Sequence, residues 1–259
     1  MSQQYDAEPA PPGPVPPPGA AAELVQQIVL LVDRGDPAPE AEGIAAAALA
    51  SVAAFIAAPE AAGWRPWAEG SFAKAVRRAD AKAFAKVRDG FPDHALAASG
   101  AGRAIAFEPV AADAVPPRIR KLQVSGTELP RATPAGHAVP AERGAKGGGA
   151  PGAGPGAAPS GDPAGLVVVL NDALGMSTGK AAAQAAHALF AWLLAADPAR
   201  LDAWLRAGRP LAVRRLGAAA FDQAVAGSGA GPLIQDAGRT EIAPGSATAC
   251  VVDDVERFA

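Results

Sequence analysis

The pattern of apolar and polar positions is similar in two distant parts of the chain. Residues 24–32 are apolar and rich in β-branched side chains, residues 33–39 have the composition of a turn, and residues 40–58 are rich in Ala. Residues 166–170 form a second run of Val and Leu, which a polar break and a long stretch of helix formers follow. A short apolar run before such a stretch predicts a buried strand that leads into a helix. We therefore expect one strand and helix of this kind in each half of the chain.

The C-terminal third continues with further helical and strand patterns. These predict a helix over residues 198–207, a strand over 211–216, a short helix over 219–226 and a final strand over 248–252. Strands and helices that follow one another in mixed order indicate an α/β sandwich.

A search for internal repeats finds a likeness between the two halves. Residues 75–84 and 212–221 agree at seven of ten positions without a gap. At the same offset of 137 residues, Trp67 aligns with Trp204. Alanine matches carry little weight in an Ala-rich chain, but shared Trp, Arg and Phe positions in one order indicate a diverged duplication.

The alignment also gives an architectural prediction. Residues 101–103 align with residues 237–239 at an offset of 136. We expect residues 24–109 to superpose on residues 166–252 as strand, helix, helix, strand, helix.

The repeat changes the interpretation of four basic residues. These residues are spaced by four positions: Lys74, Arg78, Lys82 and Lys86. On a single helix they would form a basic stripe. The repeat predicts instead a strand over 72–78 and a helix over 80–88. The cations on that helix are then expected to be a solvated surface, with an RNA-facing patch as the alternative.

Three polar side chains share one face of the helix after residue 178. At about 100° per residue, Gln184 lies roughly 40° and His187 roughly 20° from Lys180 around the helix axis. The phosphate-binding P-loop is excluded here, because the positions of its first Gly and of its Ser or Thr are Leu174 and Ala181.

Two motifs carry a resemblance to a known family. Residues 175–188 read GMSTGKAAAQAAHA, and residues 234–248 read IQDAGRTEIAPGSAT. In this order they resemble the signatures Met-x-x-Gly-Lys-x-x-x-Gln-x-x-His-Ala and Asp-Ala-Gly-Arg-Thr-Gln-Ile of the class 2 peptidyl-tRNA hydrolases, the archaeal and eukaryotic type. The resemblance covers about residues 164–254 and implies a mixed four-stranded sheet with helices on both faces.

The resemblance also implies an activity and its residues. Family members hydrolyse the ester between a peptide and the 3′ ribose of tRNA, and Lys180, Asp236 and Thr240 match positions proposed as catalytic. Lys180 suits a developing oxyanion or a phosphate, Asp236 can position water or hold Lys180 charged, and Thr240 offers a hydroxyl. We expect these three to converge on an exposed cleft at the N-terminal end of the main helix. His187 is either a hydrogen-bonded core histidine or a further catalytic residue.

The other polar positions of the two motifs are candidates for substrate binding: Ser177, Thr178, Gln184 and Arg239. No metal or other cofactor is expected, since His94 has no Cys or His neighbour at ligand spacing and His137 lies in the Gly/Pro-rich stretch, where it is expected to be solvated.

The sequence also departs from the family pattern. Asn171 and Ala173 replace an Arg and an Asp, Thr178 replaces a Lys, and Glu241 replaces a Gln. Residues 165–259 hold eight Lys and Arg against nine Asp and Glu, whereas a tRNA-binding surface favours net positive charge. A non-catalytic binding or regulatory module that keeps the hydrolase fold, and a hydrolase of another ester, are therefore the alternatives.

The composition indicates a disordered Pro-rich tail (1–21) and a Gly/Pro-rich linker (131–163). The family resemblance implies a hydrolase-like domain (164–259), and the repeat then suggests a degenerate copy of that fold (22–130). The first copy lacks the Lys, Gln and His of the motif and has Gly100 where the second has Asp236 and Ala104 where the second has Thr240. We expect a non-catalytic copy that packs on the second as an intramolecular pseudo-dimer, with a homodimer as the other arrangement.

Charge and cysteine content set outer limits. A net charge of −3 argues against a protein that coats nucleic acid along its whole surface. A single cysteine, Cys250, excludes an internal disulfide and suits a reducing cytoplasm.

The start of the chain lacks the basic region of a signal peptide, and the apolar stretches are interrupted before the roughly 20 residues that a bilayer requires. We expect no membrane association and a buried Cys250 in a strand.

Overall fold

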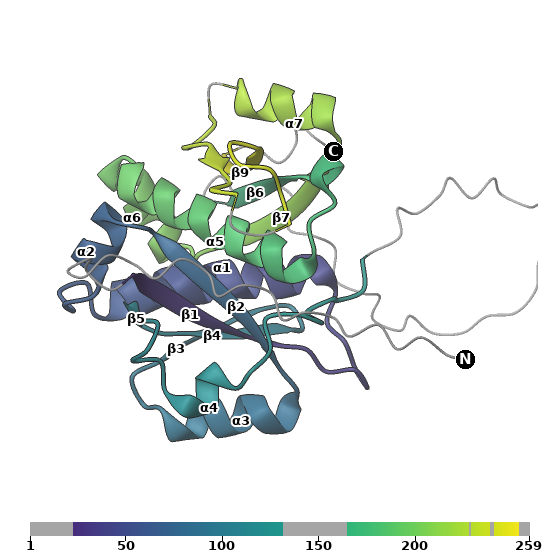
Figure 1. The fold of residues 1–259 in the computed structure, drawn as a ribbon. Coiled ribbons are helices and arrows are strands. Elements are labelled where there is room, and N and C mark those ends of the chain that lie inside the picture. Colours follow the sequence, from purple (N-terminus) through teal and green to yellow (C-terminus); the bar gives the residue numbers. More distant parts are fainter. Residues whose placement is uncertain (1–22, 132–164, 228, 239–240, 254–259) are drawn as a thin grey trace, which may run out of the picture.

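The computed structural model describes residues 23–131, 165–227, 229–238 and 241–253. These residues form two α/β halves that pack against each other (Figure 1). The Pro-rich tail and all but the first residue of the Gly/Pro-rich linker lie outside the described residues.

The N-terminal half is built on one mixed sheet. Its elements in chain order are β1 (Leu24–Leu31), α1 (Glu40–Ala57), α2 (Trp64–Glu69), β2 (Ala73–Ala79), α3 (Ala81–Gly90), β3 (Ala95–Ser99), β4 (Gly102–Ala106), β5 (Val110–Ala111) and α4 (Pro117–Arg120). The strand order is β2-β1-β4-β3, and β5 pairs with one end of β1. Strand β2 runs parallel to β1, whereas β4 is antiparallel to both β1 and β3.

The C-terminal half has the same topology. Its elements are β6 (Leu166–Asn171), the 3₁₀ helix η1 (Asp172–Leu174), α5 (Thr178–Ala195), α6 (Pro198–Arg206), β7 (Leu211–Leu216), α7 (Ala218–Val225), β8 (Ile234–Gln235) and β9 (Ala247–Val252). The order β7-β6-β9-β8 and the strand directions repeat those of the first sheet.

The expected fold class is confirmed: two mixed sheets of four or five strands, each flanked by helices. Residues 73–79 form a strand rather than part of a basic helix, as the repeat predicts. One alignment is wrong in detail. Gly102 begins β4, whereas Gly238 lies in the loop before β9, the strand that matches β4 in the sheet order. The duplication, as a statement about descent, stays a prediction.

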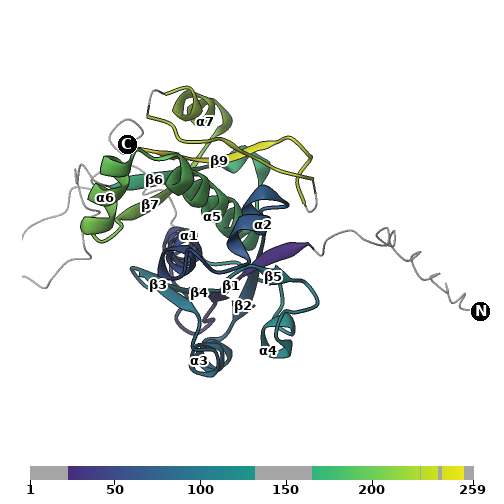
Figure 2. The same cartoon turned by 90° about the vertical axis from the view of Figure 1, so that its left-hand side faces the viewer.

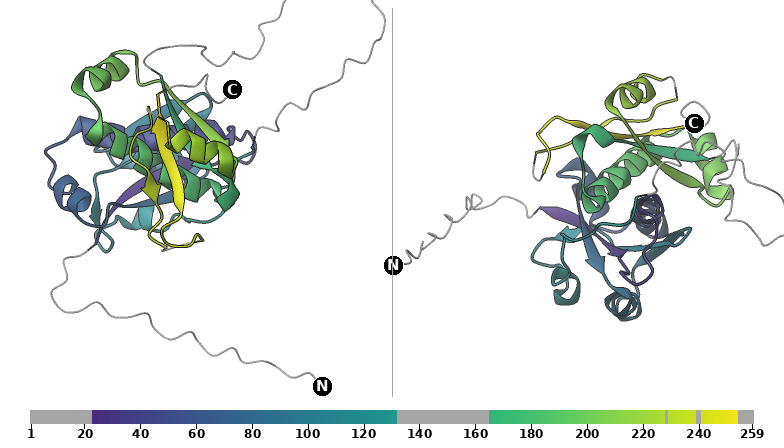
Figure 3. Two further views of the ribbon diagram at one scale, coloured as in Figure 1. Left: turned by 90° about the horizontal axis from the view of Figure 1, so that it is seen from above. Right: turned by 90° about the vertical axis from the view of Figure 1, so that its right-hand side faces the viewer.

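Helices α1 and α5 pack against each other between the two sheets (Figures 2 and 3). The alternation of strand side chains explains this layering. Ile28 of β1 and Val168 of β6 point into the central helical layer, while Val29 faces α3 and α4 and Val169 faces α7. Each sheet therefore buries one face against the shared central layer and the other against helices of its own half.

An aromatic cluster joins the halves within this layer. The ring of Phe190 on α5 meets four rings of the N-terminal half, with centroids 5.0 to 5.7 Å away: Phe55, Trp64, Trp67 and Phe72. Edge-to-face and tilted contacts of this kind add to the stabilisation from burial. Helix α5 thus depends on the N-terminal half for part of its core.

Helix α1 is long and apolar enough, by length and composition, to cross a membrane. The expectation that every apolar stretch is too interrupted therefore does not hold for α1. In this structure α1 is mostly buried between β1, β4 and α5, and its small Ala side chains allow this close packing.

An ion cluster centred on the buried Glu40 holds the N-terminal ends of α1 and α5 together. Arg215 on β7 donates to both carboxylate oxygens of Glu40, at 2.9 and 3.0 Å, and the Thr178 hydroxyl donates to Glu40 Oε1 at 2.8 Å. Arg131 also pairs with Glu40, and Asp172 pairs with both arginines. The carboxylate at the start of α1 therefore fixes the start of α5.

The segment after α4 adds a second support. The Gly179 N–H donates to Thr127 Oγ1 at 2.8 Å, and the Leu129 N–H donates to Thr178 Oγ1 at 3.3 Å. A Cβ atom on Gly179 would stand 2.6 Å from that threonine oxygen, so the close approach requires glycine. The chain of the N-terminal half thus bonds to one backbone N–H and one side-chain hydroxyl in the first turn of α5.

Candidate functional site

Three side chains of the C-terminal half interlock at the first turns of α5. The Ser177 hydroxyl caps the helix by accepting the Lys180 N–H, which places Lys180 in the first turn. The Lys180 ammonium forms an ion pair with Asp236 Oδ2, and Gln184 Nε2 donates to the same oxygen at 2.8 Å. Lysine, amide and carboxylate thus meet at one point, as the expected convergence of Lys180 and Asp236 requires.

Backbone geometry fixes the position of Asp236. The residue follows directly after β8, and its N–H and C=O bond to Ser246 and Gly245 at 2.9 and 2.7 Å, which closes the loop before β9. The Gly238 N–H donates to Asp236 Oδ1 at 2.7 Å. Gly238 has a φ of 73°, and a Cβ there would stand 2.7 Å from Pro244. Glycine is therefore required for the turn that orients the carboxylate.

A second hydrogen bond sets the orientation of Gln184. Its Oε1 accepts from the Thr248 hydroxyl of β9 at 2.8 Å, so its amide nitrogen faces Asp236. The carboxylate of Asp236 therefore receives donors from an ammonium, an amide and a backbone N–H. Asp236 keeps only 2% of its side chain exposed and Lys180 keeps 13%, so little water competes with these contacts.

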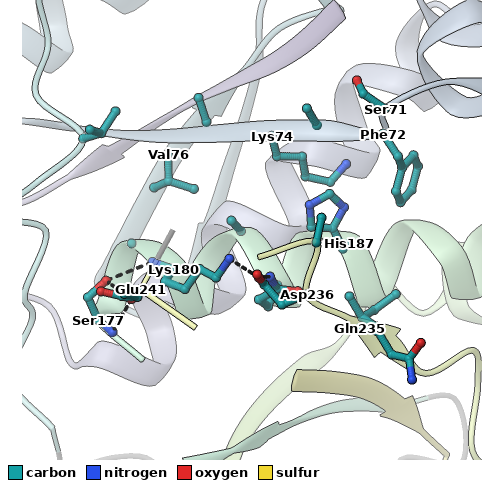
Figure 4. Close-up of a pocket in the computed structure, with 18 of the residues that line it drawn as sticks. Ser71, Phe72, Lys74, Val76, Ser177, Lys180, His187, Gln235, Asp236 and Glu241 are labelled. Carbon is teal, nitrogen blue, oxygen red and sulfur yellow. Dashed lines mark hydrogen bonds and ion pairs between the residues drawn. The ribbon is translucent and has the colours of Figure 1, made fainter. Parts of the chain in front are cut away.

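The cluster opens into a cavity of about 590 Å³ between the two halves (Figure 4). Helix α5 and the segment 233–237 form one wall, and residues 71–76, which include the start of β2, form the other. The apolar side chains at the cavity include Phe72, Val76, Val124 and Leu233. Among the described residues, no group of three His, Cys, Asp or Glu is placed to hold a metal ion.

His187 and Lys74 occupy another part of the cavity (Figure 4). The His187 ring packs beside Phe72, with centroids 5.1 Å apart. Burial lowers the pKa of His187 well below its ordinary value, and the positive charges of Lys74 and Lys180 lower it further. The ring is therefore neutral near pH 7. Burial also lowers the pKa of the Lys74 ammonium well below its ordinary value.

Residues 164–256 match the protein family described as "Peptidyl-tRNA hydrolase PTH2". A peptidyl-tRNA hydrolase of Methanocaldococcus jannaschii is 33% identical over 95 residues, which cover 83% of that protein and 34% of this chain. The chain belongs to the PTH2 family. The N-terminal half lies outside the matched range, so the PTH2 resemblance accounts for one wall of the cavity and not for the other.

The remaining residues of the PTH2 motifs lie in different surroundings. Ser177 is at the cavity, but its N–H and hydroxyl both donate to Glu241, at 3.0 and 2.9 Å. Thr178 lies between two cavity residues, but it is buried, does not line the cavity itself and donates its hydroxyl to Glu40, a position that does not favour a role in substrate binding. Arg239 and Thr240 lie outside the described residues.

The N-terminal half has a different pair at the positions of Lys180 and Asp236. Glu42 is the third residue of α1, as Lys180 is of α5, and Gly100 follows β3 as Asp236 follows β8. A Glu42 oxygen accepts the Ala101 N–H at 2.6 Å. A carboxylate that binds a backbone turn thus takes the place of the PTH2 lysine and aspartate.

The stretch near β6 that differs from the PTH2 pattern makes structural contacts. Asn171 accepts from the Ala173 N–H at 3.2 Å and donates to the Ala247 carbonyl at 3.1 Å. Asp172, between the two substituted positions, pairs with Arg131 and Arg215. This stretch therefore helps to join the two halves of the protein.

Sequence reasoning did not identify Lys74 as a cavity residue. The repeat placed this lysine on a strand rather than in a basic helical stripe, but the local pattern did not indicate that the strand lines a cavity. The contacts of Lys74 come from Phe72 and Trp67 nearby but also from Phe190, which is distant in the sequence. The alternation within β2 places Lys74 and Val76 on one face, which is the weak signal that the sequence does contain.

Proposed function

We propose that the C-terminal half hydrolyses the ester bond between a peptide and the ribose of tRNA, with water as the nucleophile. The observation that supports this most is the interlocked set of Lys180, Asp236 and Gln184 at an open cavity, within a match to the PTH2 family. The substrate would be peptidyl-tRNA or a related ester, encountered in the cytoplasm, and the reaction needs no cofactor.

In this proposal Asp236 orients the attacking water. Its Oδ2 accepts from Lys180 and Gln184, whereas Oδ1 accepts one hydrogen bond from the described residues, that of the Gly238 N–H. A carboxylate oxygen has two lone pairs, so Oδ1 can accept a second hydrogen bond from water. As the water oxygen bonds to the ester carbon, Asp236 accepts the released proton and later returns it to the leaving ribose oxygen.

Lys180 stabilises the negative charge that develops on the ester carbonyl oxygen. One of its three N–H groups is engaged by Asp236, and the others can donate to the oxyanion. Its place in the first turn of α5 adds the favourable field of the helix N-terminus. When the tetrahedral intermediate collapses, the bond to the ribose oxygen breaks, and the products are tRNA and the peptide acid, which releases the second proton of the water to solvent and becomes a carboxylate.

Thr240 and Arg239 are part of the proposal through the family motif alone. The Thr240 hydroxyl would share in positioning the water, and Arg239 would contact the substrate. His187 faces the cavity as a neutral ring, so we assign it a role in substrate contact and in proton exchange rather than that of a permanent cation.

The test is a peptidyl-tRNA cleavage assay on the full chain at low salt. Replacing Lys180 or Asp236 with Ala should reduce turnover by about 10²-fold or more, the scale of losing one oxyanion donor or one acid-base group. Lys82→Ala on α3 is the matched control, because its side chain is exposed and far from the cavity residues, and its turnover should be unchanged. Wild-type protein that folds cooperatively and leaves peptidyl-tRNA intact would favour the binding module instead.

A further inference from the structure

Lys74 is a cavity residue of the N-terminal half, the part of the chain that the PTH2 match does not reach. Its Nζ donates to Gln26 Oε1 at 3.1 Å and lies 4.0 Å from the centroid of the Trp67 ring. The rings of Phe72 and Phe190 are each 4.7 Å away. Three aromatic faces and one amide oxygen therefore hold this ammonium in place.

The charge of Lys74 has no anionic partner within the described part of the chain. Its neighbours there are the amide oxygen and the rings, and no carboxylate forms an ion pair with it. This differs from Lys180, whose charge is compensated by Asp236. Burial lowers the pKa of this amine, whereas an incoming anion favours its protonated form and binds it strongly, because the anion restores both hydrogen bonds and charge balance.

The distance between Lys180 and His187 along α5 indicates which anion Lys74 binds. Lys74 is close to His187, since the Phe72 ring contacts both: its centroid is 4.7 Å from the Lys74 Nζ and 5.1 Å from the His187 ring centroid. His187 is seven residues after Lys180, which is about 10 Å along the helix. A substrate bound with its ester at Lys180 and Asp236 can therefore reach Lys74 with a group only one sugar away. In a peptidyl-tRNA, the fixed anion at that separation is the phosphodiester on the 5′ side of the terminal ribose.

We propose that Lys74 binds the last phosphodiester of the nucleic-acid part of the substrate. The assignment rests on the proposed hydrolase function. The N-terminal half then supplies a substrate contact across the cavity from the reacting groups. Neutral His187 is adjacent and does not compete with Lys74 for the anion as a second cation would.

The test measures binding of the trinucleotide CCA, which has phosphodiesters and carries no peptide. Lys74→Met keeps the length and the apolar stem that packs on Trp67 while it removes the charge. We expect Lys74→Met to bind CCA about tenfold more weakly than wild type. The slope of log Kd against log salt concentration should fall by the amount expected for the loss of about one phosphate contact. Lys82→Met is the matched control and should bind as wild type does. Adenosine, which lacks a phosphate, should bind equally to all three proteins.

A second arm separates this proposal from the hydrolase function. For peptidyl-tRNA, Lys74→Met should raise KM about tenfold with little change in kcat. For an N-acetylaminoacyl-adenosine, which has the ester but no phosphate, the variant should equal wild type. An effect that persists on this ester would show that Lys74 contacts the peptide or the ester, and would overturn the proposal. If wild type cleaves neither substrate, the hydrolase function fails and CCA binding alone decides on Lys74.

Two further measurements distinguish loss of the Lys74 charge from loss of the fold. Lys74→Met should unfold at the same or a higher temperature, because it removes a charge that burial disfavours. Lys74→Arg retains the charge and should retain CCA binding if the variant remains folded. Equal CCA binding by wild type and folded Lys74→Met, or no CCA binding by wild type, would overturn the proposal.

Discussion

Glu241 places a negative charge where the family pattern has an uncharged Gln. Its carboxylate accepts both the N–H and the hydroxyl of Ser177, the residue that caps α5. An anion at a helix N-terminus is stabilised by the helix dipole, so Glu241 gains from this position. The same charge faces the cavity beside Lys180 and opposes the approach of a phosphate.

We predict that Glu241→Gln increases kcat/KM for peptidyl-tRNA about threefold at low salt. The amide oxygen can still accept from Ser177, so the helix cap is retained while the like-charge repulsion is removed. The gain should vanish at high salt, where screening weakens the repulsion. The measurement is kcat/KM against ionic strength for both proteins. A salt-independent change would assign the effect to the cap rather than to charge.

The two long helices depend on a carboxylate at the start of α1. Glu40 keeps only 6% of its side chain exposed and Arg215 keeps 12%, and the two form a bidentate pair. A buried pair of this kind contributes little beyond an apolar substitute, but loss of one partner leaves the other charge uncompensated. The cluster therefore makes the contact between α1 and α5 specific.

We predict that Glu40→Ala lowers the free energy of unfolding by about 3–5 kcal/mol, the scale of breaking a buried ion pair from one side. Denaturant titration measures this value. Arg65→Ala is the matched control, because its pair with Glu69 is exposed, and it should change stability by less than about 1 kcal/mol. The double variant Glu40→Met, Arg215→Met should recover much of the loss. No recovery would mean that Glu40 acts mainly through Thr178 and Arg131.

Local patterns predicted the elements well and their contacts across the halves poorly. Residues 211–216 were expected as a strand and form β7, and residues 198–207 contain α6. Lys180 and Asp236 meet because both belong to one short domain with two recognisable motifs. Thr178 shows the limit, since its motif position suggests substrate, yet Glu40 in the other half engages its hydroxyl. No periodicity within one segment encodes that contact.

The whole molecule shares one central layer between its halves. Phe190 of α5 packs against four aromatic rings of the N-terminal half, and the first turn of α5 binds Thr127 through Gly179. Neither half can bury its long helix by itself. We therefore interpret the N-terminal half as the intramolecular counterpart of a dimer partner.

We predict that residues 164–259 expressed alone self-associate or fail to unfold cooperatively, because the aromatic face of α5 is then exposed to water. The full chain should show one cooperative transition. Light scattering and thermal unfolding distinguish the two cases. Adding residues 22–131 in trans should restore a defined complex. A monomeric fragment as stable as the full chain would show that the halves fold independently.

The residues Glu42 and Gly100 affect how many substrate molecules one chain can bind. If the two halves are related by an approximate twofold axis, the cavity between β2 and α5 has a counterpart between β7 and α1. In that counterpart Glu42 takes the Lys180 position and Gly100 takes the Asp236 position. A symmetric pair of subunits would offer two equivalent sites, but this chain carries the lysine and the aspartate at one of them. Titration with a substrate analogue should therefore saturate at one equivalent per chain.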